Sequence, residues 1–208
     1  MNLNFKLYLI TDRKLCQERS LEETIQQALE AGVKAVQLRE KDLTTQELFN
    51  LADTLKDLIS QYKGGQLLIN DRLDLFLALK LDGIQVPEEG APLSRIREFT
   101  RGKLMGASVH SLEKALLAEQ EGADFLLFGP VFETDSKKGI INPQGLNKLK
   151  ETAAHVKIPV FAVGGITPEK AKECLNHGAE GVAVISSILK SKEIQKTVSE
   201  FKAALGTL

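Results

Sequence analysis

One pattern recurs four times along the chain, in EAGVKAVQL (30–38), ALKLDGIQV (78–86), EQEGADFLLF (119–128) and LNHGAEGVAV (175–184). Each stretch ends a helical segment and then runs directly into a short apolar segment. In three of them Gly32, Gly122 and Gly178 stand at the expected helix end, because glycine adopts the left-handed C-cap conformation without a Cβ penalty. The apolar segments are typical of strands buried on both faces of a parallel sheet. The pattern therefore predicts alternating helices and parallel strands.

The rest of the chain continues this alternation. Further strands are expected near LYLI (7–10), QLLI (66–69), KLMGAS (103–108) and PVFAV (159–163). Helical periodicity is clearest over 20–31, 44–62, 111–122 and 167–178. Ser20 and Glu23 have the spacing of a capping box, and Thr167-Pro168 is an N-cap followed by proline at the first helical position.

Counting the segments predicts the fold class. Eight strands alternating with eight helical segments predict an α/β protein, a single (β/α)₈ TIM barrel with parallel strands over residues 1–208. The alternative is an open, doubly wound sheet. It is disfavoured because no GxGxxG motif follows the first strand.

Composition and charge exclude several classes of protein. The 208 residues carry a formal net charge of −1, from 27 basic and 28 acidic side chains, which does not favour a nucleic-acid partner. No stretch is long and apolar enough to span a membrane, and the first residues lack a signal-peptide cleavage site. Cys16 and Cys174 have no metal or redox spacing. We expect a cytoplasmic protein that binds small molecules; its oligomeric state stays open.

Polar side chains follow nearly every expected strand, at the end of the barrel where such folds place their chemistry. They are Thr11, Asp12, Arg13, Gln37, Arg39, Glu40, Lys41, Asn70, Asp71, Arg72, Ser108, His110, Ser186 and Ser187. Single residues have structural explanations: Arg39 and Lys41 could pair with Glu40 and Asp42, and Asn70 could cap a helix. Packing alone does not require polar residues at every strand end, so a functional site is the better interpretation.

Two anion sites are expected at this end. Gly164 and Gly165, after the seventh strand, allow an anion to approach backbone N–H groups, and a short helix beginning near Ser186 follows the eighth strand. Loops after strands 7 and 8 form the recurrent phosphate site of these barrels. The second site lies around Arg39, Lys41 and Lys137, with Asp71 available for Mg²⁺. Two facing phosphate sites indicate group transfer or isomerisation of phosphorylated compounds.

The same segments carry a family resemblance. YLITD, VQLREK, INDRLDL, GASVHS, GADFLLFGPVFETDSKKG, PVFAVGGITPEKA and GVAVISSI resemble the thiamine-phosphate synthase family, with its related thiazole tautomerase branch. The resemblance covers almost the whole chain. It implies Mg²⁺-dependent coupling of hydroxymethylpyrimidine diphosphate to thiazole phosphate, with release of pyrophosphate through a benzyl-like cation.

The resemblance also implies roles for particular residues. The pyrimidine diphosphate would be bound by Gln37, Arg39, Lys41 and Asn70. Mg²⁺ would be held by Asp71. The catalytic groups would be Ser108 and Lys137, where Lys137 stabilises charge on the leaving group. The thiazole phosphate would be bound by Thr134, Ser136, Gly165, Ile185 and Ser186.

The segment after the fourth strand departs from the family pattern. The family motif there reads approximately G-V-H-L-G-Q-E-D, whereas Gln85 replaces the His, Pro87 the second Gly and Gly90 the final, metal-binding Asp. Glu88 or Glu89 would have to substitute for that Asp. Two alternatives therefore stay open: a thiazole tautomerase, and a thiazole-phosphate binder without catalysis. The tautomerase's catalytic His would fall at Pro130, which leaves His110 as its candidate proton carrier.

Overall fold

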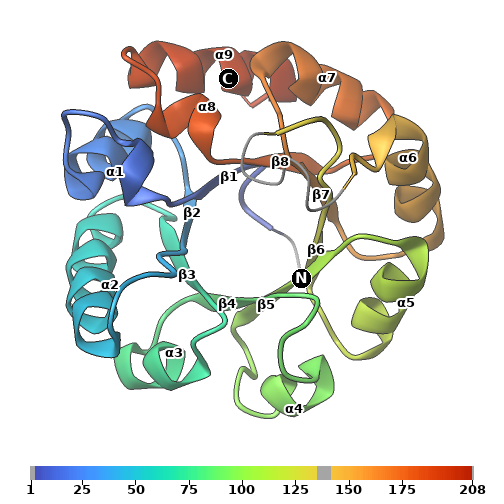
Figure 1. Cartoon of the computed structure of the whole chain (residues 1–208), viewed down its shortest axis with the longest axis horizontal. Coiled ribbons are helices and arrows are strands. Elements are labelled where there is room, and N and C mark those ends of the chain that lie inside the picture. The colour runs from blue at the N-terminus through green and yellow to red at the C-terminus, as the bar shows by residue number, and fades with distance from the viewer. Residues whose placement is uncertain (1–2, 135–141, 208) are drawn as a thin grey trace.

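The computed structural model describes residues 3–134 and 142–207 and contains the expected barrel. Eight parallel strands close in chain order, with β8 pairing back onto β1 (Figure 1). The strands are β1 (Leu7–Ile10), β2 (Ala35–Leu38), β3 (Gln66–Asn70), β4 (Gly83–Val86), β5 (Leu104–Val109), β6 (Phe125–Phe128), β7 (Val160–Val163) and β8 (Gly181–Val184). The predicted (β/α)₈ fold is confirmed, and the open-sheet alternative is wrong.

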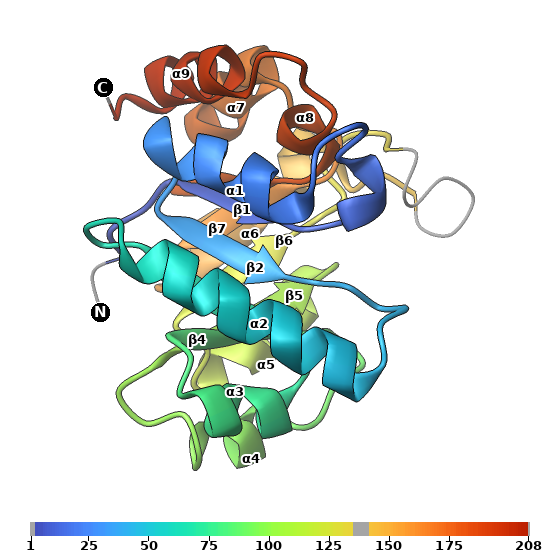
Figure 2. The ribbon, with the colours of Figure 1, turned by 90° about the vertical axis from the view of Figure 1, so that its left-hand side faces the viewer.

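Helices surround the barrel on its outside. They are α1 (Leu21–Glu30), α2 (Thr45–Ser60), α3 (Leu73–Leu79), α4 (Leu93–Arg97), α5 (Leu112–Gln120), α6 (Gly145–His155), α7 (Pro168–Asn176), α8 (Ser186–Leu189) and α9 (Ile194–Leu205). Figure 2 shows α1 and α2 against the outside of the barrel, and α8 at the end toward which β2 points. No helix in the described part of the chain is long and apolar enough to cross a membrane.

The predicted helix signals act as expected. Ser20 forms a capping box with Glu23 at the start of α1, and Thr167 caps α7 ahead of Pro168. Gly32 and Gly178, which follow helices α1 and α7, have φ of +105° and +87°, in the left-handed region that glycine adopts readily. These local signals explain why the expected boundaries fall within one or two residues of the observed ones.

The side chains that fill the barrel interior change from apolar to polar along the barrel axis. At the amino ends of the strands it is filled by aromatic rings, with the Phe5 and Phe161 centroids 5.3 Å apart and those of Tyr8 and Phe125 5.8 Å apart. Side chains alternate faces along a strand, so Gln37 and Asn70 share the inward face of Ala35 and Leu68. The carboxyl ends of the strands therefore point polar groups into the barrel, above an apolar core.

Candidate functional site

A cavity of about 650 Å³ opens at the carboxyl ends of the strands. Its wall includes all the predicted binding residues that the structure describes, together with Ser108: Gln37, Arg39, Lys41, Asn70, Thr134, Gly165, Ile185 and Ser186. Two predicted residues, Ser136 and Lys137, lie outside the described residues. Asp71 is described, but it is an exposed residue outside the cavity wall.

Neutral hydrogen-bonding groups lie behind the cavity wall, where the fully buried Tyr8 and Gln85 contact the lining residues Gln37 and Ser108. Gln37 Nε2 donates to the Tyr8 hydroxyl over 3.3 Å, and Gln85 Nε2 donates to Ser108 Oγ over 3.1 Å. Burial raises the pKa of Tyr8 well above its ordinary value, so its hydroxyl keeps its proton. Amide and hydroxyl groups of this kind suit a polar, uncharged ring. Neither Tyr8 nor Gln85 was predicted as part of the site, although alternation along β4 places Gln85 on the inward face.

The cationic side of the cavity is supplied by Arg39 and Lys41. The structural alternative, in which they pair with Glu40 and Asp42, is wrong. Arg13 forms ion pairs with both carboxylates, because its NH1 lies 2.9 Å from Glu40 and 2.6 Å from Asp42. The guanidinium of Arg13 holds the pKa of Asp42 well below its ordinary value. Within residues 3–134 and 142–207, Arg39 and Lys41 form no ion pair, so both remain available to an anionic ligand.

Asn70 and Asp71 lie at the end of β3. Asn70 does not cap a helix, because the N-cap of α3 is Arg72 and no side chain caps it. Asp71 has φ of +60°, which is uncommon outside glycine, and its N–H donates to the Gln85 carbonyl over 3.0 Å. Arg72 pairs with Asp74 at 2.6 Å. The Asp71 carboxylate has no hydrogen bond or ion pair in the part of the chain that the structure describes.

The loops after β7 and β8 lie beside each other. Gly164 and Gly165 have φ of +99° and +65°, and a Cβ on Gly165 would lie 2.3 Å from the Glu133 carbonyl oxygen. The Ser187 hydroxyl donates to the Ile166 carbonyl over 2.5 Å and joins the two loops. Among the described residues the backbone N–H groups of Gly165 and Ser186 have no acceptor. Both residues lie on the cavity wall, where the sequence predicts a phosphate site.

The segment after β4 places its two carboxylates differently. Glu88 Oε2 accepts from the His110 backbone N–H over 2.7 Å and lies 3.1 Å from His110 Nδ1, on the cavity wall. Glu89 is exposed, and a Cβ on Gly90 would lie 2.9 Å from Val86 Cγ1. The described residues contain no group of three or more acidic, His or Cys side chains that could hold a metal. The Glu88–His110 pair was not predicted, since only the folded loop brings them together.

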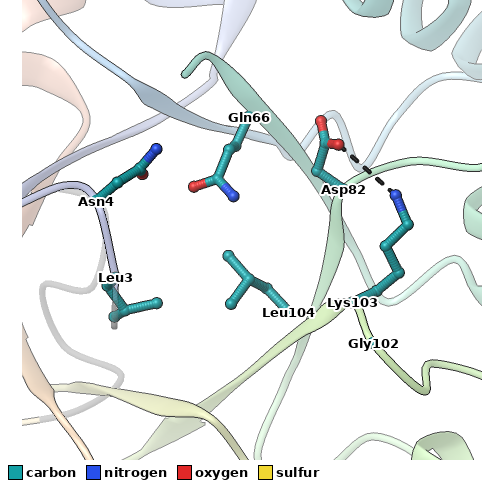
Figure 3. A pocket seen from close by; sticks show the side chains of 7 residues that line it. All are labelled: Leu3, Asn4, Gln66, Asp82, Gly102, Lys103 and Leu104. Atoms are coloured by element: carbon teal, nitrogen blue, oxygen red, sulfur yellow. Dashed lines mark ion pairs between the residues drawn. The ribbon is translucent and has the colours of Figure 1, made fainter. Parts of the chain in front are cut away.

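A second cavity, of about 300 Å³, lies at the opposite end of the barrel (Figure 3). Asp82 accepts from the Leu67 N–H over 3.0 Å and lies 3.8 Å from Lys103 Nζ. Asn4 donates to the Gly64 carbonyl over 3.1 Å. These contacts connect strand beginnings to neighbouring loops, and polar groups at this end of a barrel generally serve stability. The candidate site is therefore the larger cavity.

The chain is similar to known proteins along almost its full length. A family model described as thiamine monophosphate synthase matches residues 7–188. The chain is 41% identical to the thiamine-phosphate synthase of Clostridium novyi, over 94% of this chain and 96% of that protein. It is 42% identical to the thiamine-phosphate synthase of Clostridium acetobutylicum, over 93% of this chain and 92% of that one.

A solved structure agrees with these relatives. Thiamine phosphate pyrophosphorylase from Pyrococcus furiosus matches with a TM-score of 0.87 and 38% identity, covering 97% of this chain and 95% of that one. The range matched by the family model includes every predicted site residue. The predicted family and its transferase activity are confirmed by these relatives. The chain belongs to the thiamine monophosphate synthase family.

Proposed function

We propose that the large cavity binds hydroxymethylpyrimidine diphosphate and thiazole phosphate, joins them into thiamine phosphate and releases pyrophosphate. The observation that carries the proposal is the composition of the cavity wall. Among the described residues, neutral amides, three cations without an ion-pair partner (Arg39, Lys41 and Lys190) and backbone N–H groups without an acceptor all line a cavity of about 650 Å³. Such a volume accommodates ligands of this size.

The diphosphate is assigned to the side of the cavity formed by β2 and β3. Arg39 and Lys41 neutralise its charge, and an arginine fork fits phosphate oxygens well. Gln37 and Asn70 offer amide groups to the pyrimidine, and Ser108 of β5 offers a hydroxyl. The thiazole phosphate is assigned to the N–H groups of Gly165 and Ser186, beside Ile185. Thr134 lines the same cavity, and Ser136, outside the described residues, is proposed to bind the same substrate.

The reaction needs no acid–base pair. The bond between the pyrimidine methylene carbon and the diphosphate oxygen breaks, and its electron pair leaves with pyrophosphate. The thiazole nitrogen then donates its lone pair to the methylene carbon and forms the new C–N bond. Arg39, Lys41 and Lys137 stabilise the charge that grows on the leaving group, and the cavity holds the two substrates in line.

Asp71 follows the wall residue Asn70 and would hold Mg²⁺ at the edge of this site through one carboxylate. The Asp71 carboxylate accepts no hydrogen bond from a described residue, and Mg²⁺ is commonly bound by one or two carboxylates plus substrate phosphates. Glu88 is engaged by His110, and position 90 has no carboxylate. Bound there, Mg²⁺ would neutralise charge on the diphosphate. We propose that Asp71 alone supplies the protein's direct ligand, and that the protein acts in the cytoplasm without a nucleic-acid partner.

Product formation tests the proposal. Purified protein with both substrates and Mg²⁺ is expected to form thiamine phosphate, and omission of either substrate is expected to abolish it. Asp71→Ala is expected to lose most of the turnover. Asp74→Ala is the matched control, since that carboxylate lies in the same segment but pairs with Arg72. Equal turnover in both variants would refute the assignment of Asp71.

A thiazole tautomerase is the second candidate, because the Glu88–His110 pair lies on the cavity wall and could move a proton. The assay is the absorbance change on aromatisation of thiazole carboxylate phosphate, with His155→Ala on the exposed end of α6 as control for His110→Ala. Tautomerisation that requires His110, without thiamine phosphate formation, would replace the synthase assignment. Saturable binding of thiazole phosphate with neither reaction would indicate a binder.

A further inference from the structure

A hydrogen bond between Gln85 and Ser108 links the cavity wall to the barrel interior. Gln85 lies on the inward face of β4 and is 0% exposed. Its Nε2 donates to Ser108 Oγ over 3.1 Å, across the register that pairs Gln85 with Gly106 of β5. Its backbone carbonyl also accepts the Asp71 N–H. One residue therefore contacts Ser108 through its side chain and the end of β3 through its backbone.

Gly106 provides the space that this contact needs. A Cβ at position 106 would lie 2.3 Å from Gln85 Oε1 and 2.5 Å from Phe125 Cζ. A side chain on the inward face of β5 at that level would therefore displace the Gln85 amide. Glycine at 106 lets the amide lie against β5 and reach the Ser108 hydroxyl.

Only one of the two polar atoms of the Gln85 amide has a hydrogen-bond partner among the described residues. Its Oε1 is buried and has no hydrogen-bond partner within the described residues. A buried polar atom without a partner lowers stability, and an apolar side chain of similar shape removes that cost. Packing alone does not account for glutamine at this position, whereas its donor group does have a defined target.

The direction of the hydrogen bond sets what Ser108 can offer a ligand. A serine hydroxyl carries one proton to donate and two lone pairs that accept. Because Gln85 donates to Oγ, the Ser108 proton stays available for an acceptor in the cavity. We infer that Gln85 is a positioning residue that holds Ser108 as a hydrogen-bond donor toward the bound pyrimidine diphosphate. This inference rests on the proposed function.

A double-mutant cycle tests the coupling. Gln85→Met keeps the length of the side chain and removes the donor, and we expect kcat/KM to fall at least about 10-fold, since small misplacements of a reacting group can cost about 100-fold. In a Ser108→Ala background the same change is expected to have no further effect. A loss of equal size in both backgrounds, or no loss in either, would overturn the inference.

The matched control is Gln66→Met. Gln66 also has an unpartnered, buried Oε1 within the described part of the chain, but it lies beside the small cavity at the other end of the barrel (Figure 3). Gln66→Met is expected to leave kcat/KM unchanged. The thermal midpoint of Gln85→Met is expected to equal or exceed that of the wild type, because an unpaired oxygen is removed. A lower midpoint with kcat/KM unchanged would indicate a structural role and overturn the inference.

Failure of the proposed function is distinguished by measurements that need no turnover. If the wild type forms no thiamine phosphate, the Gln85 side-chain amide signal in a ¹H–¹⁵N spectrum, identified by its loss in Gln85→Met, still reports the contact. It is expected to shift in Ser108→Ala, and an unchanged signal would overturn the inference. The affinity for the pyrimidine diphosphate, measured by calorimetry in the same four proteins, must show the same coupling.

Discussion

Arg13 and Arg39 both lie near the rim of the barrel, and their guanidinium groups differ in what they contact. Arg13 donates to Glu40, a residue only 6% exposed, and to Asp42. Arg39 lines the cavity and has no ion pair in the described part of the chain. The ion pairs therefore indicate that Arg13 stabilises the fold, whereas the guanidinium of Arg39 remains available to bind an anionic ligand. The sequence pattern REKD, residues 39–42, did not reveal this, because Arg13 comes from the preceding βα unit.

Replacing each arginine by alanine separates the two roles. Arg39→Ala is expected to lower the affinity for the pyrimidine diphosphate by about 10- to 100-fold, because a charge-assisted hydrogen bond is worth about 1.5–3 kcal/mol. The thermal midpoint of this variant is expected to stay unchanged. Arg13→Ala is expected to lower the thermal midpoint, because the buried Glu40 carboxylate loses its partner. Calorimetry and thermal unfolding of both variants check this. The opposite pattern would reverse the assignment.

The loops after β6, β7 and β8 act as one element of the site. The Val131 N–H donates to the Val163 carbonyl over 2.8 Å, and the Phe132 N–H donates to the Gly164 carbonyl over 3.1 Å. Ser187 then connects the β8 loop to Ile166. The phosphate side of the cavity depends on this backbone contact, and the two glycines are the residues that permit it.

Gly165→Ala should disrupt that contact. Its φ of +65° strains an L-residue, and the added Cβ would lie 2.3 Å from a backbone oxygen that has little room to move. Gly102→Ala, with φ of +76° and nothing within 4 Å of the Cβ, is the matched control and should cost only the strain, about 1–2 kcal/mol. We expect Gly165→Ala to destabilise more and to weaken thiazole phosphate binding, whereas Gly102→Ala leaves binding intact. Equal affinities in calorimetry would contradict this account.

Over the whole molecule, paired carboxylates determine the response to acid. Arg13 lowers the pKa of Asp42, Arg72 lowers that of Asp74, and hydrogen bonds from Thr44 lower that of Glu47. Their ordinary values are 3.8 for Asp and 4.5 for Glu. A carboxylate whose folded-state pKa lies below its unfolded-state value stabilises the fold above the unfolded value, and this stability is lost as the pH falls through the folded one.

The urea midpoint is therefore expected to stay nearly constant from about pH 7 to 5 and to decrease below about pH 4. In Arg13→Ala the decrease should be smaller, because Asp42 then loses the partner that lowers its pKa most and keeps only Lys14. Circular dichroism in urea at a series of pH values measures both curves. Two results would contradict the role of these ion pairs. One is a urea midpoint that rises as the pH falls. The other is an equal decrease of the midpoint below about pH 4 in Arg13→Ala and in the wild type.

Much of the barrel was predictable because its signals are local. Capping residues, glycines after helices and short apolar runs mark the boundaries of the elements, and the carboxyl ends of parallel strands must meet on one face. Gln37, Ser108 and Gly165 could be assigned to one cavity on that basis. The Glu88–His110 pair could not, since it joins loops after different strands. The position of Asp71 outside the wall, and its left-handed backbone at the end of β3, are likewise specified by no sequence pattern.

The central claim is that this barrel joins two phosphorylated substrates although position 90 has no carboxylate. The most direct test measures pyrophosphate and thiamine phosphate together, in one reaction with wild-type protein, both substrates and Mg²⁺. We predict equal amounts of the two products, formed only when both substrates and Mg²⁺ are present. Absence of thiamine phosphate from folded protein that still binds thiazole phosphate would contradict the claim.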